Sequence, residues 1–243
     1  EAHFLAVAEA VDLPMVLYNV PGRTGVDLLP ETVARLAAHP NVRGIKEATG
    51  DNGRVAALRD ACGGDLLLYS GEDAQARDYV LQGGDGVISV TANVAPARVH
   101  SVMTAAKAGD VTAAEAADAP LAALHRDLFC EANPIPVKWA LAKMGKVTDS
   151  IRSPLVSLGA KFHARVESAL QTASLIDGEP ASGSEGWPSR DLLLQGHLFD
   201  QGLINQARAA QLRRISANLG ESRLISCGSS ARPSTSSRSK TAP

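Results

Sequence analysis

The chain has 243 residues, of which 45% are apolar and 21% charged, and its formal net charge is −2. This balance is typical of a globular protein with a core, and the absence of a basic cluster ahead of the C-terminal tail argues against nucleic acid as a partner. No apolar run is long enough to span a membrane, and the first residues carry no secretory signal pattern, so we expect a cytoplasmic location.

A helix is expected at the start of the chain. Phe4, Leu5, Ala8 and Val11 recur at helical spacing, and the chain begins inside this pattern with Glu1 instead of Met. We therefore expect the chain to lack the beginning of its domain.

Four short aliphatic runs then alternate with helical patterns. The predicted strands are MVLYNV, VRGIKEA, LLLYSG and GVISV, at residues 15–20, 42–48, 66–71 and 86–90. The helical stretches between them include ETVARLAA and NGRVAALRDAC. Continuous apolar strands that alternate with helices are typical of a parallel sheet covered on both faces, so the pattern predicts an α/β fold.

The composition changes twice after the last strand. Residues 94–173 are rich in alanine and show helical periodicity throughout, which predicts a helical annex. In its last helix, Phe162, Val166, Ala169 and Leu170 form one apolar stripe. Residues 174–243 begin with a Gly/Ser/Pro-rich stretch and end in a Ser/Arg-rich tail, for which we expect disorder and early proteolysis between residues 177 and 190.

Two candidate catalytic residues lie late in consecutive predicted strands. Lys46 lies near the end of VRGIKEA, where burial or a neighbouring cation lowers a lysine pKa and leaves an amine able to attack a carbonyl. Tyr18 ends MVLY, so parallel pairing brings its phenol within reach of that amine. The alternatives are a lysine extending to solvent or paired with Glu47, and a core tyrosine whose hydroxyl is satisfied at the strand end.

Other features of the sequence are less informative. Arg23, in the loop after Tyr18, has the planar guanidinium that suits a carboxylate, although most loop arginines are solvated. The GGDG segment before the fourth strand predicts a turn. The histidines at 39, 100, 125 and 163 show no metal-ligand spacing and are expected at the surface or core edge. The three cysteines are far apart and suggest neither a disulfide framework nor a zinc site.

Four longer segments resemble a known family. LYNVPGRTGVDLLPETVARLAAHPNVRGIKEATGD, LLYSGEDA, GGDGVISVTANVAP and NPIPVKWAL are similar to the second half of the dihydrodipicolinate synthase family, which belongs to the pyruvate-dependent class I aldolases. The resemblance covers about residues 1 to 173. It implies strands five to eight of a TIM (β/α)8 barrel in residues 1–93, followed by the helical annex.

The resemblance also implies a chemistry. Lys46 would form a Schiff base with pyruvate, and Tyr18 would transfer protons there. Arg23 would bind the carboxylate of aspartate semialdehyde, and Ile88 would contact pyruvate through its backbone. The resulting enzyme would be a lyase of lysine (diaminopimelate) biosynthesis that needs no metal or organic cofactor. The complete protein would be a homo-oligomer, specifically a homotetramer. It would have no nucleic-acid or membrane partner.

The rest of such a barrel is not in this sequence. By resemblance it would carry a threonine-rich loop for the pyruvate carboxylate, a second relay tyrosine and the lysine feedback site, so we expect the chain to be inactive alone. Two alternatives stay open: another aldolase of the family, such as a sialic-acid or keto-sugar-acid lyase, and a catalytically silent half-barrel that acts as an assembly module.

Overall fold

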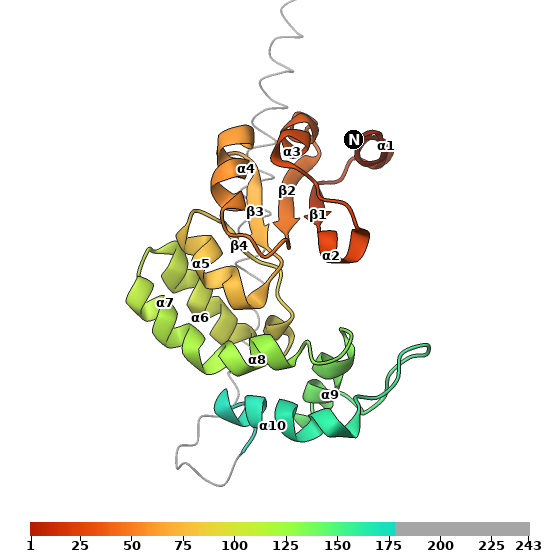
Figure 1. Ribbon diagram of the computed structural model, residues 1–243, viewed down its shortest axis with the longest axis vertical. Coiled ribbons are helices and arrows are strands. Elements are labelled where there is room, and N and C mark those ends of the chain that lie inside the picture. Colours follow the sequence, from red (N-terminus) through yellow and green to blue (C-terminus); the bar gives the residue numbers. More distant parts are fainter. Residues whose placement is uncertain (178–243) are drawn as a thin grey trace, which may run out of the picture. The chain divides into compact units, whose positions relative to one another are not determined.

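In the computed structural model, which describes residues 1–177, four strands form one parallel sheet in chain order (Figure 1). The strands are β1 (Met15–Asn19), β2 (Val42–Glu47), β3 (Leu67–Ser70) and β4 (Gly86–Val87). Their register aligns Tyr18 with Lys46, Lys46 with Tyr69, and Tyr69 with Gly86. The predicted α/β organisation with a parallel sheet is confirmed.

The fourth strand is shorter than the sequence predicts. Residues 86–90 are all apolar or small, but pairing ends after the Ile88 amide, which donates to the Ser70 carbonyl at 2.9 Å. Beyond Ser89, the amides of Val90 and Thr91 donate to the Asp73 carboxylate at 2.9 and 3.0 Å. Because a side chain takes these donors, the backbone leaves the sheet and turns into the 3-10 helix η2 (Thr91–Asn93).

Helices cover one face of the sheet. Side chains alternate along a strand, so Leu17, Ile45 and Leu68 point to the same side, where all three are buried. They share a core with residues of α1 (Ala2–Ala10), α3 (Pro30–Ala37), α4 (Arg54–Cys62) and α5 (Ala76–Leu81). The helix predicted at the start of the chain is therefore confirmed, as are the helices predicted for ETVARLAA and NGRVAALRDAC between the strands.

The other face of the sheet carries no helix among residues 1–177. Val16, Tyr18 and Ile88 lie on this side and are 43 to 45% exposed. The sequence pattern had indicated a sheet covered on both faces, and within the described residues this is wrong for the face that bears Tyr18.

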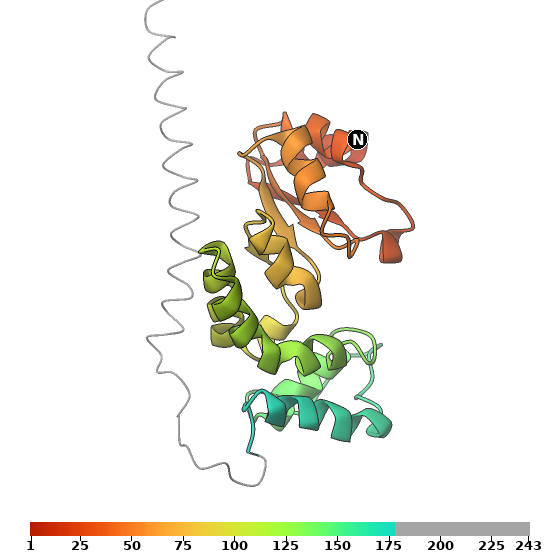
Figure 2. The ribbon, with the colours of Figure 1, turned by 60° about the vertical axis from the view of Figure 1, so that its left-hand side comes forward.

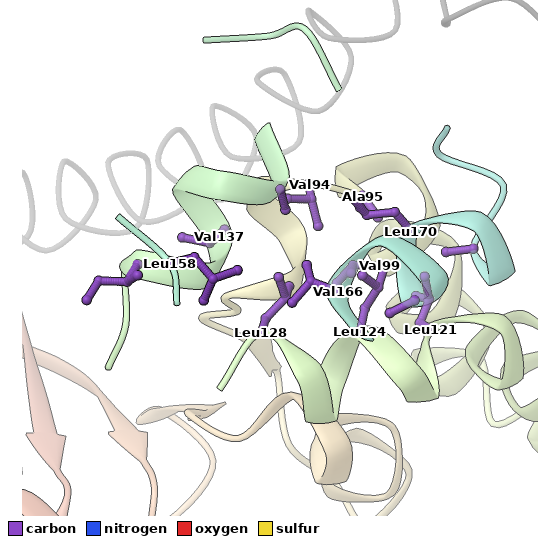
Figure 3. Packing of buried hydrophobic residues seen from close by; sticks show 14 of the residues in the cluster. Val94, Ala95, Val99, Leu121, Leu124, Leu128, Val137, Leu158, Val166 and Leu170 are labelled. Carbon is purple, nitrogen blue, oxygen red and sulfur yellow. The ribbon is translucent and has the colours of Figure 1, made fainter. Parts of the chain in front are cut away.

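After β4 the described chain contains only helices (Figures 1 and 2). They are α6 (Pro96–Lys107), α7 (Val111–Asp118), α8 (Ala122–Asp127), α9 (Ile135–Lys143) and α10 (His163–Thr172), with short 3-10 turns η3 (Ala119–Leu121) and η4 (Ala160–Phe162). Figure 3 shows their shared core, in which Leu124, Leu128, Val166 and Leu170 are fully buried. Burial of Val166, Ala169 and Leu170 confirms three positions of the stripe predicted for the last helix, whereas Phe162 lies in η4 before that helix and is only partly buried.

Some local predictions were incomplete. Residues 154–159 were expected to be helical but lie outside any helix, and α10 begins only at His163. His125 was expected at the surface or core edge but is 7% exposed, with Nδ1 2.9 Å from Thr91 Oγ1 and Nε2 3.1 Å from Asp118 Oδ1. Both ring nitrogens therefore have a partner inside the fold, and Thr91 lies 34 residues away in the sequence. The GGDG turn before β4 is confirmed.

The expected linker and tail fall outside the described residues from residue 178 onward, and Cys227 lies there as well. Just before that point, Leu175 and Ile176 pack partly against the helical core. Cys62 and Cys130 are free, half-buried thiols. Within residues 1–177, every helix is too short or too polar to cross a bilayer.

Tyr79 of α5 offers a test of the covered core. Its side chain is 1% exposed, and its hydroxyl is buried without a hydrogen-bond partner among the described residues. Burial raises the pKa of Tyr79, so the hydroxyl stays protonated. Because an unpaired buried hydroxyl destabilises the folded state, Tyr79→Phe is expected to raise the free energy of unfolding by about 1 kcal/mol in urea titrations. Tyr18→Phe, at an exposed site, is the control with no change. A loss of stability in Tyr79→Phe would contradict this reading.

Candidate active site

Tyr18 and Lys46 meet on the exposed face of the sheet. They are register partners on β1 and β2, and Lys46 Nζ lies 4.5 Å from the centroid of the Tyr18 ring. The predicted adjacency of the phenol and the amine is confirmed. Tyr18 is 45% exposed, so the alternative of a core tyrosine is wrong.

Gly71 leaves room for the lysine. The residue follows β3, and a Cβ built there would lie 2.7 Å from the Ala48 Cβ and 3.0 Å from the Lys46 Cε. Its amide donates to the Glu47 carbonyl at 2.6 Å, which continues the ladder beyond β3 and fixes this close approach. A side chain at position 71 would therefore displace either the backbone or the Lys46 stem.

The surroundings of Lys46 lower its pKa. The main cause is partial burial of the Lys46 amine, which desolvates its charged form, and the positive charge of Arg23 lowers the pKa further. The carboxylates of Asp73 and Glu72 oppose this effect but do not cancel it. Glu72 is itself partly desolvated beside Asp73, which raises its pKa. Because the pKa of Lys46 is lowered, a larger fraction of its amine is neutral than in an ordinary surface lysine. The neutral amine is the nucleophilic form.

Arg23 lies in a short helix that the sequence did not indicate. This helix, α2 (Pro21–Thr24), begins with proline and is capped by the following residue, Gly25, whose φ of 69° favours glycine. Arg23 is exposed, and its charge acts on Lys46 from this position. The structure thus places the guanidinium in the loop next to the Tyr18 strand end, as predicted.

Ile88 lies directly after β4 on the same face as Tyr18 and Lys46. Its side chain is 43% exposed, and its amide is bonded to Ser70. The Asp73 carboxylate binds the amides of Val90 and Thr91 just beyond it. The four candidate residues therefore converge at the carboxyl ends of the strands, while their chemical roles stay predictions.

Several residues around the site were missed by sequence reasoning. Glu47, considered as a partner of Lys46, instead forms its ion pair with Arg54 at 3.4 Å among the described residues. Asn19 donates hydrogen bonds to Glu47 on the covered face. The negative charges of Glu72 and Asp73 act on Lys46 and raise its pKa. The available signal was position: Asn19 and Glu47 end β1 and β2, and Glu72 and Asp73 follow β3 within three residues, at the sheet end where polar side chains of a parallel sheet gather.

The comparison with known proteins identifies the family of the chain. Residues 1–173 match the model of the Dihydrodipicolinate synthetase family. The 4-hydroxy-tetrahydrodipicolinate synthase of Alcanivorax borkumensis is 55% identical over 175 residues, which cover 72% of this chain and 60% of that protein. The chain thus spans about 60% of the length of the curated relatives it matches.

Solved structures show the same similarity. A chloride-inhibited dihydrodipicolinate synthase from Acinetobacter baumannii, complexed with pyruvate, is 50% identical with a TM-score of 0.70, covering 72% of this chain and 60% of that one. A dihydrodipicolinate synthase described as the first monomeric variant is 38% identical with a TM-score of 0.69, over the same shares of the two chains. Together with the parallel sheet, these neighbours support a TIM-barrel type of fold. The chain belongs to the dihydrodipicolinate synthetase family.

Proposed function

We propose that this chain supplies the C-terminal half of an aldolase that condenses pyruvate with aspartate semialdehyde, giving 4-hydroxy-tetrahydrodipicolinate. The observation that carries the proposal is the placement of the Lys46 amine 4.5 Å from the Tyr18 ring, at the end of a parallel strand and with a lowered pKa. In this proposal residues 1–93 form strands five to eight of a (β/α)8 barrel, residues 94–173 a helical annex, and residues 174–243 a linker and tail.

The reaction follows from the amine. Neutral Lys46 attacks the keto carbon of pyruvate, and loss of water gives a protonated imine. The imine accepts the electron pair left when the methyl group loses a proton, so an enamine forms instead of a free carbanion. The enamine carbon bonds to the aldehyde carbon, the aldehyde oxygen takes up a proton and the imine is restored. Attack on the imine carbon by the amino group of the semialdehyde then closes the ring and releases the Lys46 amine. The Tyr18 hydroxyl lies on the same face and is suited to proton transfer at these steps.

Arg23 favours a carboxylated aldehyde over the longer sugar substrates of related aldolases. A short aldehyde that carries a carboxylate needs a cation at the rim, and the exposed Arg23 is placed there. Ile88 is proposed to bind pyruvate through its backbone. Homo-oligomerisation of the complete protein and a cytoplasmic location stay predictions, and one structural neighbour is described as a monomeric variant.

The test compares this chain with a joined protein, in which the chain is preceded by the N-terminal part of the Alcanivorax borkumensis relative, the part that this proposal assigns to the other half of the barrel. The joined protein is expected to consume pyruvate and aspartate semialdehyde together, and the chain alone is expected to consume neither. Cleavage of a sialic acid by the joined protein would favour the other aldolase reading. A folded joined protein without any aldol activity would favour the silent module.

Replacing Arg23 tests the aldehyde site. In the joined protein, Arg23→Ala is expected to lower kcat/KM for aspartate semialdehyde roughly 10- to 150-fold, equivalent to about 1.5 to 3 kcal/mol for one lost charge-assisted hydrogen bond. Borohydride trapping of the pyruvate adduct should still succeed. Loss of the adduct in Arg23→Ala would show that the arginine has a structural role instead.

The charges near Lys46 predict two opposite pH shifts. The rate of adduct formation with pyruvate should fall as pH decreases through the lowered pKa of Lys46, because protonation removes the nucleophile. Glu72→Gln removes an anion that raises this pKa, so its pH profile should move to lower pH. Arg23→Ala removes a cation that lowers this pKa, so its profile should move to higher pH. Shifts in the reverse directions would contradict the electrostatic account.

A further inference from the structure

A polar cluster lies on the sheet face opposite Tyr18 and Lys46. It contains Asn19, Asp27, Glu47 and Arg54, contributed by β1, the loop after it, β2 and α4. Glu47 is 3% exposed and Asn19 2% exposed, so the centre of the cluster is inaccessible to water. Asn19 Nδ2 donates to both Glu47 carboxylate oxygens at 3.2 and 3.1 Å. Arg54 Nε donates to Glu47 Oε2 at 3.4 Å and compensates its charge.

The cluster is linked to the candidate catalytic pair by strand geometry. Asn19 directly follows Tyr18 and Glu47 directly follows Lys46, so the alternation of side chains places the two pairs on opposite faces. Asn19 and Glu47 are themselves register partners. A displacement of the cluster would therefore be transmitted to Tyr18 and Lys46 through single peptide units.

The same cluster holds the loop that carries Arg23. Asp27 Oδ1 accepts from Asn19 Nδ2 and from Arg54 Nη2, both at 2.8 Å. Leu28 is bonded through both backbone groups: its amide donates to Asn19 Oδ1 and its carbonyl accepts from Arg54 Nη2, each at 2.9 Å. The two ends of the loop are thereby joined at its base.

Apart from the bonds of Asp27 and Leu28, little holds the loop at residues 20–26 in place. Within the described part of the chain, the hydrogen bonds recorded for residues 20–26 stay within the loop, and α2 buries none of its residues. The position of α2, and with it Arg23, therefore depends on Asp27 and Leu28. Arg54 is suited to this task because its planar guanidinium donates from separate nitrogens, from Nε to Glu47 and from Nη2 to Asp27 and the Leu28 carbonyl, whereas a lysine would have to reach all three acceptors with one nitrogen.

We propose that the Asp27–Arg54 ion pair is a positioning device for Arg23, which fixes the loop relative to Lys46 and so determines how well a carboxylated aldehyde binds. Only the effect on aldehyde binding rests on the proposed function. The fixing of the loop is a property of the chain itself and is measured without any substrate.

Trypsin cleavage of the chain tests the positioning directly. The Arg23–Thr24 bond lies in α2 and should be cut slowly while the loop is held. Asp27→Ala removes the carboxylate but leaves the Arg54–Glu47 pair, and cleavage at Arg23 is expected to become about tenfold faster. The Arg35–Leu36 bond of α3, where Leu36 is fully buried, serves as the internal reference and should keep its rate.

A matched control is available on the same edge of the sheet. Asp51 is also exposed, and among residues 1–177 its side chain accepts only from the nearby Gly53 amide, at 2.8 Å. Asp51→Ala should leave cleavage at Arg23 unchanged. The proposal is overturned if Asp27→Ala changes this rate less than twofold, if Asp51→Ala has the same effect, or if cleavage at Arg35 rises equally. Asp27→Asn, which keeps the side-chain volume, repeats the comparison should the alanine variant be unstable.

Kinetics of the joined protein separate the positioning from the substrate assignment. Asp27→Ala should raise KM for aspartate semialdehyde about tenfold and leave KM for pyruvate unchanged, and in combination with Arg23→Ala it should add almost nothing further. An additive double variant, or equal effects on both substrates, would contradict the proposal. If the joined protein lacks activity while the trypsin result holds, the proposed function fails and the positioning of the loop stands.

Discussion

Replacing Lys46 with arginine is expected to abolish the borohydride-trapped pyruvate adduct of the joined protein, with a loss of about a thousandfold or more in adduct formation. Arginine keeps the positive charge and a long stem, but its guanidinium stays protonated at any working pH and does not attack a carbonyl. The change should therefore remove the nucleophile without adding a buried cavity. Intact-mass measurement after reduction reports the adduct.

Lys138→Arg is the control for this experiment. Lys138 belongs to α9, outside the sheet that carries Tyr18 and Lys46, and its replacement should leave the adduct unchanged. A Lys46→Arg protein that still forms the adduct at the parent rate would remove Lys46 from the mechanism. It would also remove the reason for placing the site at this end of the sheet.

Replacing Tyr18 with phenylalanine is expected to slow the condensation by roughly a hundred- to a thousandfold. The aromatic ring beside Lys46 is kept, so the packing and the contact with the amine should survive. Only the hydroxyl that transfers protons is lost. The pyruvate adduct should still form, but more slowly, in stopped reactions reduced with borohydride at successive times.

Tyr79→Phe gives the matched comparison, because its ring lies in the covered core and should leave the rate unchanged. Equal rates for Tyr18→Phe and the parent protein would show that the proton transfers use another group. The pair of variants thus separates loss of a hydroxyl at the site from loss of a hydroxyl elsewhere in the chain.

The meeting of Tyr18 and Lys46 could be predicted because parallel strands place equivalent ends side by side. An apolar run that ends in a polar residue marks the end of a strand in the sequence itself. When two such strands follow one another and pair in parallel, their register places the two polar residues side by side. The covered face was likewise predictable from strand and helix periodicity. The exposure of the other face does not follow from that periodicity, since the apolar pattern of a strand does not say what covers it; it follows only from the resemblance to half of a barrel, whose interior side chains an open half-sheet exposes.

The polar clusters could not be predicted from the sequence. Arg54 reads as an ordinary helix residue, and its contact with Asp27 depends on how α4 packs on the sheet. The early end of β4 has a similar cause, because Asp73 takes the amides of Val90, which the apolar sequence assigns to the strand, and of Thr91, which follows it. In each case a single polar side chain overrides the local preference through a contact that is remote in sequence.

The measurement that tests the central claim most directly is peptide mapping of the joined protein after pyruvate and borohydride treatment. The account predicts that the added mass lies on the peptide that contains Lys46, and that it disappears when pyruvate is omitted. Recovery of the label on Lys138 or Lys143 instead would contradict the assignment of the Schiff base to the end of β2.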